Sequence, residues 1–124
     1  MAFKFEKLIV WQKSLDLTAL VHSVTLKFPK DELYGLTSQM RRSAVSIPSN
    51  ISEGCSRGTD PAFIKFLEYA IGSAFEIETQ LIAVERLHLV PKEKLELINK
   101  MVNEDKMADT IKNNFRKYLK GLKL

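Results

Sequence analysis

The residues best suited to chemistry lie close together in the stretch SQMRRSAVSIPSNISEG, residues 38–54. Two adjacent arginines there, Arg41 and Arg42, have planar guanidinium groups that can bind phosphates or carboxylates. Spacings of four, three and four residues place one polar stripe on a helix: Arg42, Ser46, Ser49 and Glu53. No nucleophile and base converge with them, so the sequence predicts a binding surface in a protein that is not an enzyme.

Two glutamates further along the chain offer these arginines a partner. Glu78 and Glu85 are seven residues apart, at the edge of the apolar face of their predicted helix. An unpaired carboxylate buried there is costly, which makes Arg41 or Arg42 the natural counter-ion. Two interpretations stay open: an ion pair that fixes the register of two helices, or an arginine surface that contacts a polyanion.

A second basic surface is predicted near the end of the sequence. After Asp109 there is no acidic residue, and the cationic residues are Lys112, Arg116, Lys117, Lys120 and Lys123. Cations near a helix C-terminus are favoured by the helix dipole, and a charged run is often only a solvated face. The alternative is a contact with RNA, with DNA or with an acidic protein. With nucleic acid, such contacts would be directed at phosphates and largely independent of sequence.

Other kinds of site are not specified. The single cysteine, Cys55, allows no intramolecular disulfide, which fits a reducing compartment. His22 and His88 are far apart in the sequence and no metal-binding spacing occurs, so we predict no metal and no cofactor. The sequence shows no signal-peptide pattern and no apolar run near the roughly 18 residues of a membrane span. It therefore predicts a cytoplasmic protein without a membrane contact.

The composition is that of one globular domain. The chain has 124 residues, of which 45% are hydrophobic and 27% charged, and this suffices for one core. The net charge of +4 is compatible with a polyanionic partner but does not require one. Only five glycines and four prolines interrupt the chain, which favours few and long elements.

Three short stretches rich in turn-forming residues, FPKDE, CSRGTDP and HLVPK, divide the chain into four segments. Apolar residues recur in them at helical spacing and not with period two. The sequence predicts an all-α fold, an antiparallel up-down-up-down four-helix bundle, because short connections make successive helices antiparallel. The predicted single domain covers residues 1–124, with helices at about 6–28, 32–54, 61–88 and 91–121.

Two helix ends and one bend are also predicted. The apolar spacing of the second helix continues through Pro48, so we predict one helix bent near that residue. Gly54 is a suitable C-terminal cap for it. Asp60 is the predicted N-cap of the third helix, with Pro61 as its first residue.

The first predicted helix has two apolar stripes rather than one. The second stripe includes Leu8, Trp11 and Leu15. Such a helix is either the central, well-covered helix of the bundle or packs against another subunit. In the second case Leu8, Trp11 and Leu15 form an oligomer interface.

Three stretches of the sequence, VWQKSLDL, FPKDELYGLTSQMRRSAVSIPSNISEG and FIKFLEYAIGSAFEIETQL, together resemble the 23S rRNA intervening-sequence protein family, whose members are four-helix bundles. The resemblance covers about residues 5–89. Arg41 and Arg42 match the family's arginine pair. The residues that match its Ser-Asn-Ile-x-Glu-Gly motif, taken with the two later glutamates, make up a predicted structural polar network: Asn50, Glu53, Glu78 and Glu85.

The resemblance also implies a function. Relatives act as accessory variability determinants beside reverse transcriptases, as homopentameric rings whose basic surface binds nucleic acid and the reverse transcriptase. It implies that this chain forms a homo-oligomer, a pentamer, that binds RNA or DNA. The alternative is a protein-interaction scaffold, for example an accessory subunit of a reverse transcriptase or a partner of another acidic protein, without appreciable nucleic-acid affinity of its own.

Overall fold

The computed structural model describes residues 5–100, apart from the side chains of Lys7 and Asn99. Within this range the chain forms four α-helices and no strand, which confirms the all-α prediction for these residues. The helices are α1 (Ile9–Thr25), α2 (Ser38–Ser56), α3 (Asp60–Arg86) and α4 (Glu96–Asn99). Short helical turns lie between or before them: η1 (Phe5–Lys7), η2 (Lys30–Glu32), η3 (Leu33–Thr37) and η4 (Lys92–Lys94).

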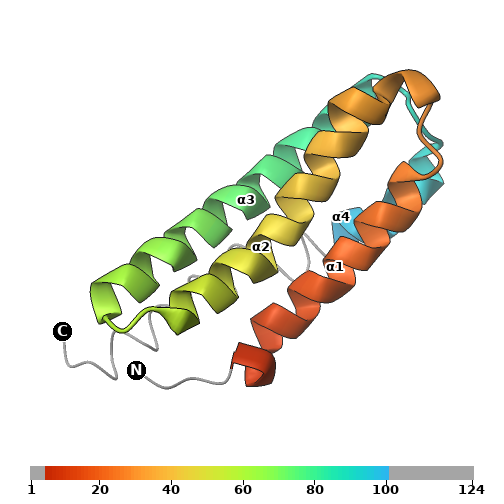
Figure 1. Ribbon diagram of the computed structural model, residues 1–124. Coiled ribbons are helices and arrows are strands. Elements are labelled where there is room, and N and C mark those ends of the chain that lie inside the picture. The colour runs from red at the N-terminus through yellow and green to blue at the C-terminus, as the bar shows by residue number, and fades with distance from the viewer. Residues whose placement is uncertain (1–4, 101–124) are drawn as a thin grey trace.

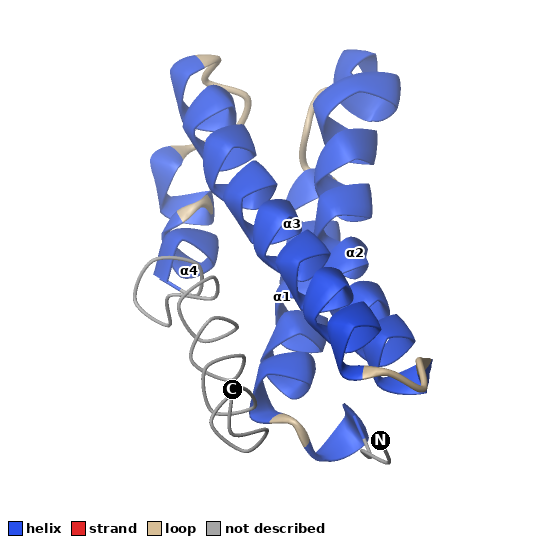
Figure 2. Cartoon of the chain, turned by 90° about the vertical axis from the view of Figure 1, so that its left-hand side faces the viewer, coloured by secondary structure: helices blue, strands red, loops and turns tan. Residues whose placement is uncertain are grey.

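The three long helices lie lengthwise beside one another. Figure 1 shows the chain reversing direction between α1 and α2, and again between α2 and α3. α2 packs against both α1 and α3, and these are the most extensive helix contacts of the described part. Figure 2 shows that short loops join the helices. The full up-down-up-down order stays a prediction, because most of the fourth predicted helix lies outside the described residues.

The core consists of apolar side chains at the predicted helical spacings. Its long-helix members include Val10, Leu17 and Val21 of α1, Met40, Ala44, Ile47 and Ile51 of α2, and Phe63, Leu67, Ile77, Leu81 and Val84 of α3. Leu95 and Ile98 complete it from the α4 region, and each is at most 1% exposed. Burial of these side chains, rather than helix propensity, supplies most of the stability of such helices.

The second predicted helix differs from the observed one at both ends. The backbone leaves helical geometry at Gly35, with φ −109° and ψ −115°, so α2 begins at Ser38 and not near residue 32. The helix also continues past Gly54 to Ser56, so the prediction of Gly54 as a cap is wrong. Pro48 lies buried inside α2, and the predicted bend there stays a prediction.

Gly54 serves close packing instead of ending the helix. A Cβ at this position would lie 2.9 Å from Cβ of Phe66 and 3.3 Å from the carbonyl oxygen of Phe63. Real Cβ atoms do not approach that closely, so α2 and α3 can meet here only because residue 54 has no side chain.

The third helix starts close to its predicted position. Extended Thr59, with φ −129° and ψ 149°, takes the N-cap position that we predicted for Asp60, and Asp60 is the first helical residue. At the other end α3 stops at Arg86, two residues before the predicted end at residue 88.

Helix α3 is terminated by a residue in the left-handed backbone conformation. His88 has φ 52°, and the amides of His88 and Leu89 donate to the carbonyls of Glu85 and Val84, at 3.2 and 3.3 Å. This pattern satisfies carbonyl groups that a helix end otherwise leaves unpaired. Glycine usually takes such a position, so His88 carries a backbone cost that the chain turn requires.

Cys55 is buried, which alters its reactivity. Burial raises the pKa of its thiol from 9.0 to about 11, with a smaller contribution from the negative charge of Glu6. Because only the thiolate reacts, a pKa that is higher by about two units leaves about a hundredfold less thiolate at neutral pH. We expect Cys55 to react with an aromatic disulfide reagent about a hundredfold more slowly in the folded protein than in the urea-unfolded chain.

The pH dependence of that reaction gives a second readout. The rate should level off near pH 11 in the folded protein and near pH 9 in the unfolded chain. Since the folded state favours the protonated thiol, its contribution to stability is present below pH 9.0 and is lost as the pH rises toward about 11. Equal rates for the folded and unfolded chains at neutral pH would contradict the burial of this thiol.

Candidate functional site

A polar seam runs along the contact between α2 and α3. We define the polar seam by Gln39, Arg42, Ser43, Ser46 and Asn50 of α2 and by Ser73, Glu76 and Gln80 of α3. On α3, spacings of three and four residues place the three side chains on one face of the helix. Two serines of α2, Ser43 and Ser46, are thus explained: they face polar partners of α3 rather than a core.

The first part of the seam is a chain of hydrogen bonds among Gln80, Ser43 and Glu76. Ser43 Oγ donates to Glu76 Oε2 at 3.0 Å, and Gln80 Nε2 donates to Ser43 Oγ at 3.0 Å. Ser43 has one proton, which goes to the carboxylate, so the amide of Gln80 must present its nitrogen to Ser43. The amide oxygen, Oε1 of Gln80, is buried and has no hydrogen-bond partner among the described residues.

The second part of the seam is centred on a pair of serines. The hydroxyls of Ser46 and Ser73 lie 2.5 Å apart. Asn50 Nδ2 donates to both the hydroxyl and the carbonyl of Ser46, at 3.0 and 2.8 Å, and Ser73 Oγ donates to the Tyr69 carbonyl at 3.2 Å. All protons are used once if Ser46 donates to Ser73, so the polar groups satisfy one another across the helix contact.

A surface hollow lies at the first part of the seam, where Gln80, Ser43 and Glu76 are hydrogen-bonded. A hollow of about 320 Å³ is lined by seam residues from Gln39 to Gln80, including Arg42. A second hollow, of about 410 Å³, shares Gln39, Glu76 and Gln80 and adds Phe75, which is 46% exposed. Both volumes lie at the lower end of the range of small-molecule sites.

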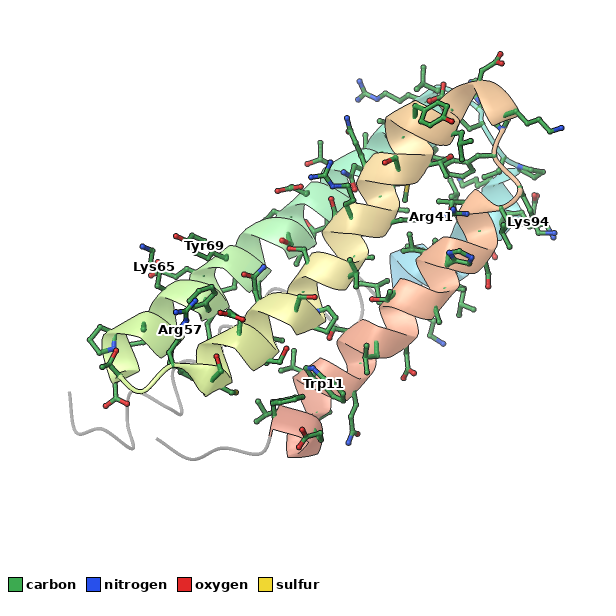
Figure 3. The ribbon with its side chains drawn as sticks, in the orientation of Figure 1. Trp11, Arg41, Arg57, Lys65, Tyr69 and Lys94 are labelled. Carbon is green, nitrogen blue, oxygen red and sulfur yellow. The ribbon has the colours of Figure 1, made fainter. Side chains whose placement is uncertain are left out.

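The two predicted arginines have different environments. Arg41 is half-buried, and its Nε donates to Thr25 Oγ1 at 2.8 Å, near the C-terminal end of α1, where the helix dipole favours a cation (Figure 3). Arg42 is exposed at the wall of the first hollow. Residues 5–100 contain no ion pair between either arginine and Glu78 or Glu85. The predicted pairing is corrected: the acid that enters the seam is Glu76.

A second group of side chains, cationic and aromatic, lies at the turn between α2 and α3. We call Arg57, Lys65, Phe66 and Tyr69 the basic–aromatic cluster. The Arg57 guanidinium carbon lies 4.9 Å from the centre of the Phe66 ring, and Lys65 Nζ lies 5.9 Å from the centre of the Tyr69 ring. The two rings meet edge to face, with centres 5.6 Å apart. Figure 3 shows Arg57, Lys65 and Tyr69 near this turn, far from Lys94 at the opposite end.

The remaining predicted residues fall into three groups. Asn50 lies in the seam, whereas Glu53 forms an exposed ion pair with Arg57 at 2.6 Å. Leu8 and Trp11 pack partly on the core, and Leu15 is 39% exposed. The predicted basic surface of the fourth helix, Lys112, Arg116, Lys117, Lys120 and Lys123, lies outside the described residues.

Sequence reasoning missed the α3 side of the seam. The signal was present, because Tyr69, Ser73, Glu76 and Gln80 repeat the same four, three and four spacing as the arginine stripe. The predicted stripe on α2 is itself partly wrong. Ser49 is exposed, and Ser43 and Asn50 make the contacts with polar side chains instead.

Residues 5–100 contain no group of three or more metal-ligating side chains that could hold a metal ion. None of their helices is both long and apolar enough to cross a membrane.

The comparisons with known proteins agree with the fold. The family model described as "23S rRNA-intervening sequence protein" matches residues 6–109. Among solved structures, the chain is similar to a protein of unknown function from the S23 ribosomal protein family of Bacteroides thetaiotaomicron VPI-5482. The identity is 24%, the TM-score is 0.77, and the match covers 87% of this chain and 96% of that one. At this identity the likeness shows the fold alone.

The comparison with curated proteins finds no match. The family model, by contrast, covers well over half of the sequence, and the arginine pair and the Ser-Asn-Ile stretch both lie within the matched residues. The chain therefore belongs to the 23S rRNA-intervening sequence protein family.

Proposed function

We propose that this protein is a non-enzymatic, oligomeric nucleic-acid-binding protein whose basic residues contact the phosphate backbone. The observation that carries the proposal is the basic–aromatic cluster. Cationic groups bind phosphates and exposed rings stack on bases, and this combination is typical of surfaces that hold single strands. Lys65 and Tyr69 are exposed, so both kinds of contact are available. The names of the family and of the Bacteroides relative, which refer to 23S rRNA and a ribosomal protein, support the proposal.

We extend the proposal to the assembly. The family resemblance suggests a homopentamer, with Leu8, Trp11 and Leu15 at its interface and the fourth helix completing an up-down-up-down bundle. Exposed apolar side chains on α1 support an interface there: Ile9 is 66% exposed and Leu15 is 39% exposed. The mass in solution, measured by light scattering, tests this part. A monomer at high concentration would exclude it.

Nucleic-acid binding is tested by fluorescence anisotropy with labelled single-stranded RNA, structured RNA and duplex DNA. We expect an affinity that falls steeply between about 50 mM and about 200 mM salt, by a thousandfold or more if 6–10 phosphates are contacted. The Arg57→Gln, Lys65→Gln double variant should bind more weakly. Its salt slope for single strands should be smaller by about 0.7 for each phosphate that the variant no longer neutralises.

The matched control removes two charges at the other end of the molecule. Lys92→Gln with Lys94→Gln changes the net charge equally, and both residues are exposed in η4. The proposal requires the cluster variant to lose more affinity than this control. Equal losses would indicate only a general charge effect. No binding at low salt would exclude the proposal.

The alternative function is a protein-interaction scaffold with an acidic partner such as a reverse transcriptase. It is favoured by exposed apolar side chains near the α1–α2 connection: Tyr34 is 92% exposed and Leu26 is 67% exposed. Such a protein would assemble normally and would bind no nucleic acid at physiological salt.

A further inference from the structure

The polar seam has hydrogen-bonding capacity that the described residues leave unused. Gln80 Oε1 is a buried acceptor with no partner in the described part. Glu76 uses Oε2 to accept from Ser43, and no donor of the described residues reaches its Oε1. A buried acceptor without a donor is unfavourable, and the exposed carboxylate of Glu76 offers a second acceptor beside it, so a ligand that donates two hydrogen bonds would satisfy both.

The same hollow also holds a positive charge. Arg42 lines it, is exposed, and has no ion pair or hydrogen bond with any described residue. A ligand that presents acceptors to this guanidinium group, as well as donors to the two acceptors, would use all three groups. A simple phosphate offers acceptors only, and an amine offers donors only.

Guanine satisfies both requirements. Its Watson–Crick edge carries two adjacent donors, N1–H and the 2-amino group, which no other standard base offers. Its O6 and N7 are the acceptors that arginine binds most often. Phe75, 46% exposed in the wall of the adjoining hollow, supplies apolar ring surface beside such a base.

We propose that the polar seam recognises an unpaired guanine of a bound single strand, with Glu76 and Gln80 accepting from N1–H and the 2-amino group and Arg42 donating to O6 and N7. The proposal rests on the nucleic-acid-binding function proposed above and adds the site and the base. It assigns the seam a role in selecting the base, and the basic–aromatic cluster a role in holding the strand.

A strand fits better than a free nucleotide because the seam continues to the cluster. Arg42 lies in α2 and Arg57 directly follows that helix, so a rise of 1.5 Å per residue separates them by about 22 Å. The α3 face links the two regions through Ser73, whose hydroxyl donates to the Tyr69 carbonyl. One nucleotide does not span that distance, whereas several linked nucleotides do.

The test compares labelled oligouridine with the same strand carrying one central guanosine, by anisotropy on the full chain. We expect the guanosine strand to bind about tenfold to a hundredfold more tightly. Inosine at that position lacks the 2-amino group and should lose most of the gain. Free guanosine monophosphate should compete far more weakly than the guanosine strand.

The matched variants are Glu76→Gln and Glu93→Gln. Both remove one negative charge, and Glu93 is exposed in η4, away from the seam. Glu76→Gln should abolish the preference for guanosine, so that the guanosine strand binds this variant no more tightly than oligouridine does. Glu93→Gln should keep the preference. Circular dichroism checks that both variants fold, and if Glu76→Gln does not, the inosine comparison decides alone.

The outcomes separate the two proposals. Equal, salt-dependent binding of both strands would overturn the guanine site and leave the general nucleic-acid function in place. Equal competition by free guanosine monophosphate would overturn the assignment to a strand. No binding of any strand at low salt would overturn both proposals.

Discussion

Gly54→Ala is expected to destabilise the protein by about 1–3 kcal/mol, although alanine is the better helix former. The new Cβ would lie 2.9 Å from Cβ of Phe66 and 3.3 Å from the Phe63 carbonyl oxygen. Neither neighbour can move easily, because the Phe63 oxygen belongs to the backbone and Cβ of Phe66 is bonded directly to its own backbone Cα. The helices must therefore move apart, and the packing along the α2–α3 interface weakens. Urea unfolding followed by circular dichroism measures the destabilisation.

Gly72→Ala is the matched control. Gly72 lies exposed inside α3, and an added Cβ there meets nothing within 4 Å. Alanine in an exposed helix interior gains about 0.5–1 kcal/mol over glycine, so this variant should be more stable than the parent. The two substitutions should thus have opposite signs. A Gly54→Ala variant as stable as Gly72→Ala would show that α2 and α3 are not in close contact at this point.

Arg41→Ala is expected to cost about 1.5–3 kcal/mol of stability, the range for a hydrogen bond to a charged group. Its Nε donates to Thr25 Oγ1, which is 3% exposed and itself donates to the Val21 carbonyl at 2.7 Å. The guanidinium group therefore ties α2 to the last turn of α1 and lies where the helix dipole favours a positive charge. Arg41→Lys should recover only part of the stability, because an ammonium group cannot reproduce the guanidinium geometry. Urea unfolding measures both variants.

The neighbouring arginine supplies the control. Arg42 is exposed and has no partner among the described residues, so Arg42→Ala should change the stability by less than about 0.5 kcal/mol. In nucleic-acid binding the larger effect should come from the other arginine. Arg42→Ala should lower the affinity, whereas Arg41→Ala should lower it only as far as its reduced stability does. If both variants had equal stability, the hydrogen bond between Arg41 and Thr25 would have no structural role.

These pairs of variants separate two roles within one short motif. The adjacent arginines look equivalent in the sequence, yet one holds two helices together and the other faces a hollow. Ser43 and Ser46 of the same stretch form hydrogen bonds with α3, which give the helix pair a fixed register. A surface that combines a rigid polar framework with an exposed arginine is suited to recognition.

The sequence by itself determined the helical class and most of the core. Apolar spacing is a property of a single helix, and so the buried faces of α1, α2 and α3 follow from local periodicity. The ends of elements were less predictable. Gly54 looked like a cap because glycine commonly follows a helix, but here its small size is needed by a neighbouring helix.

Only the tertiary structure decided which polar side chains meet. Glu76 and Glu78 are two residues apart, and at 3.6 residues per turn they point about 200° apart around α3. Which of them faces α2 depends on how the two helices are rotated against each other, and that rotation is set by the whole interface, including the close approach at Gly54. The same rotation brings Arg41 to Thr25 and leaves Arg42 at the hollow. The sequence contains the residues of the site, and the packing of the helices selects among them, because a hydrogen bond requires a partner within about 3 Å.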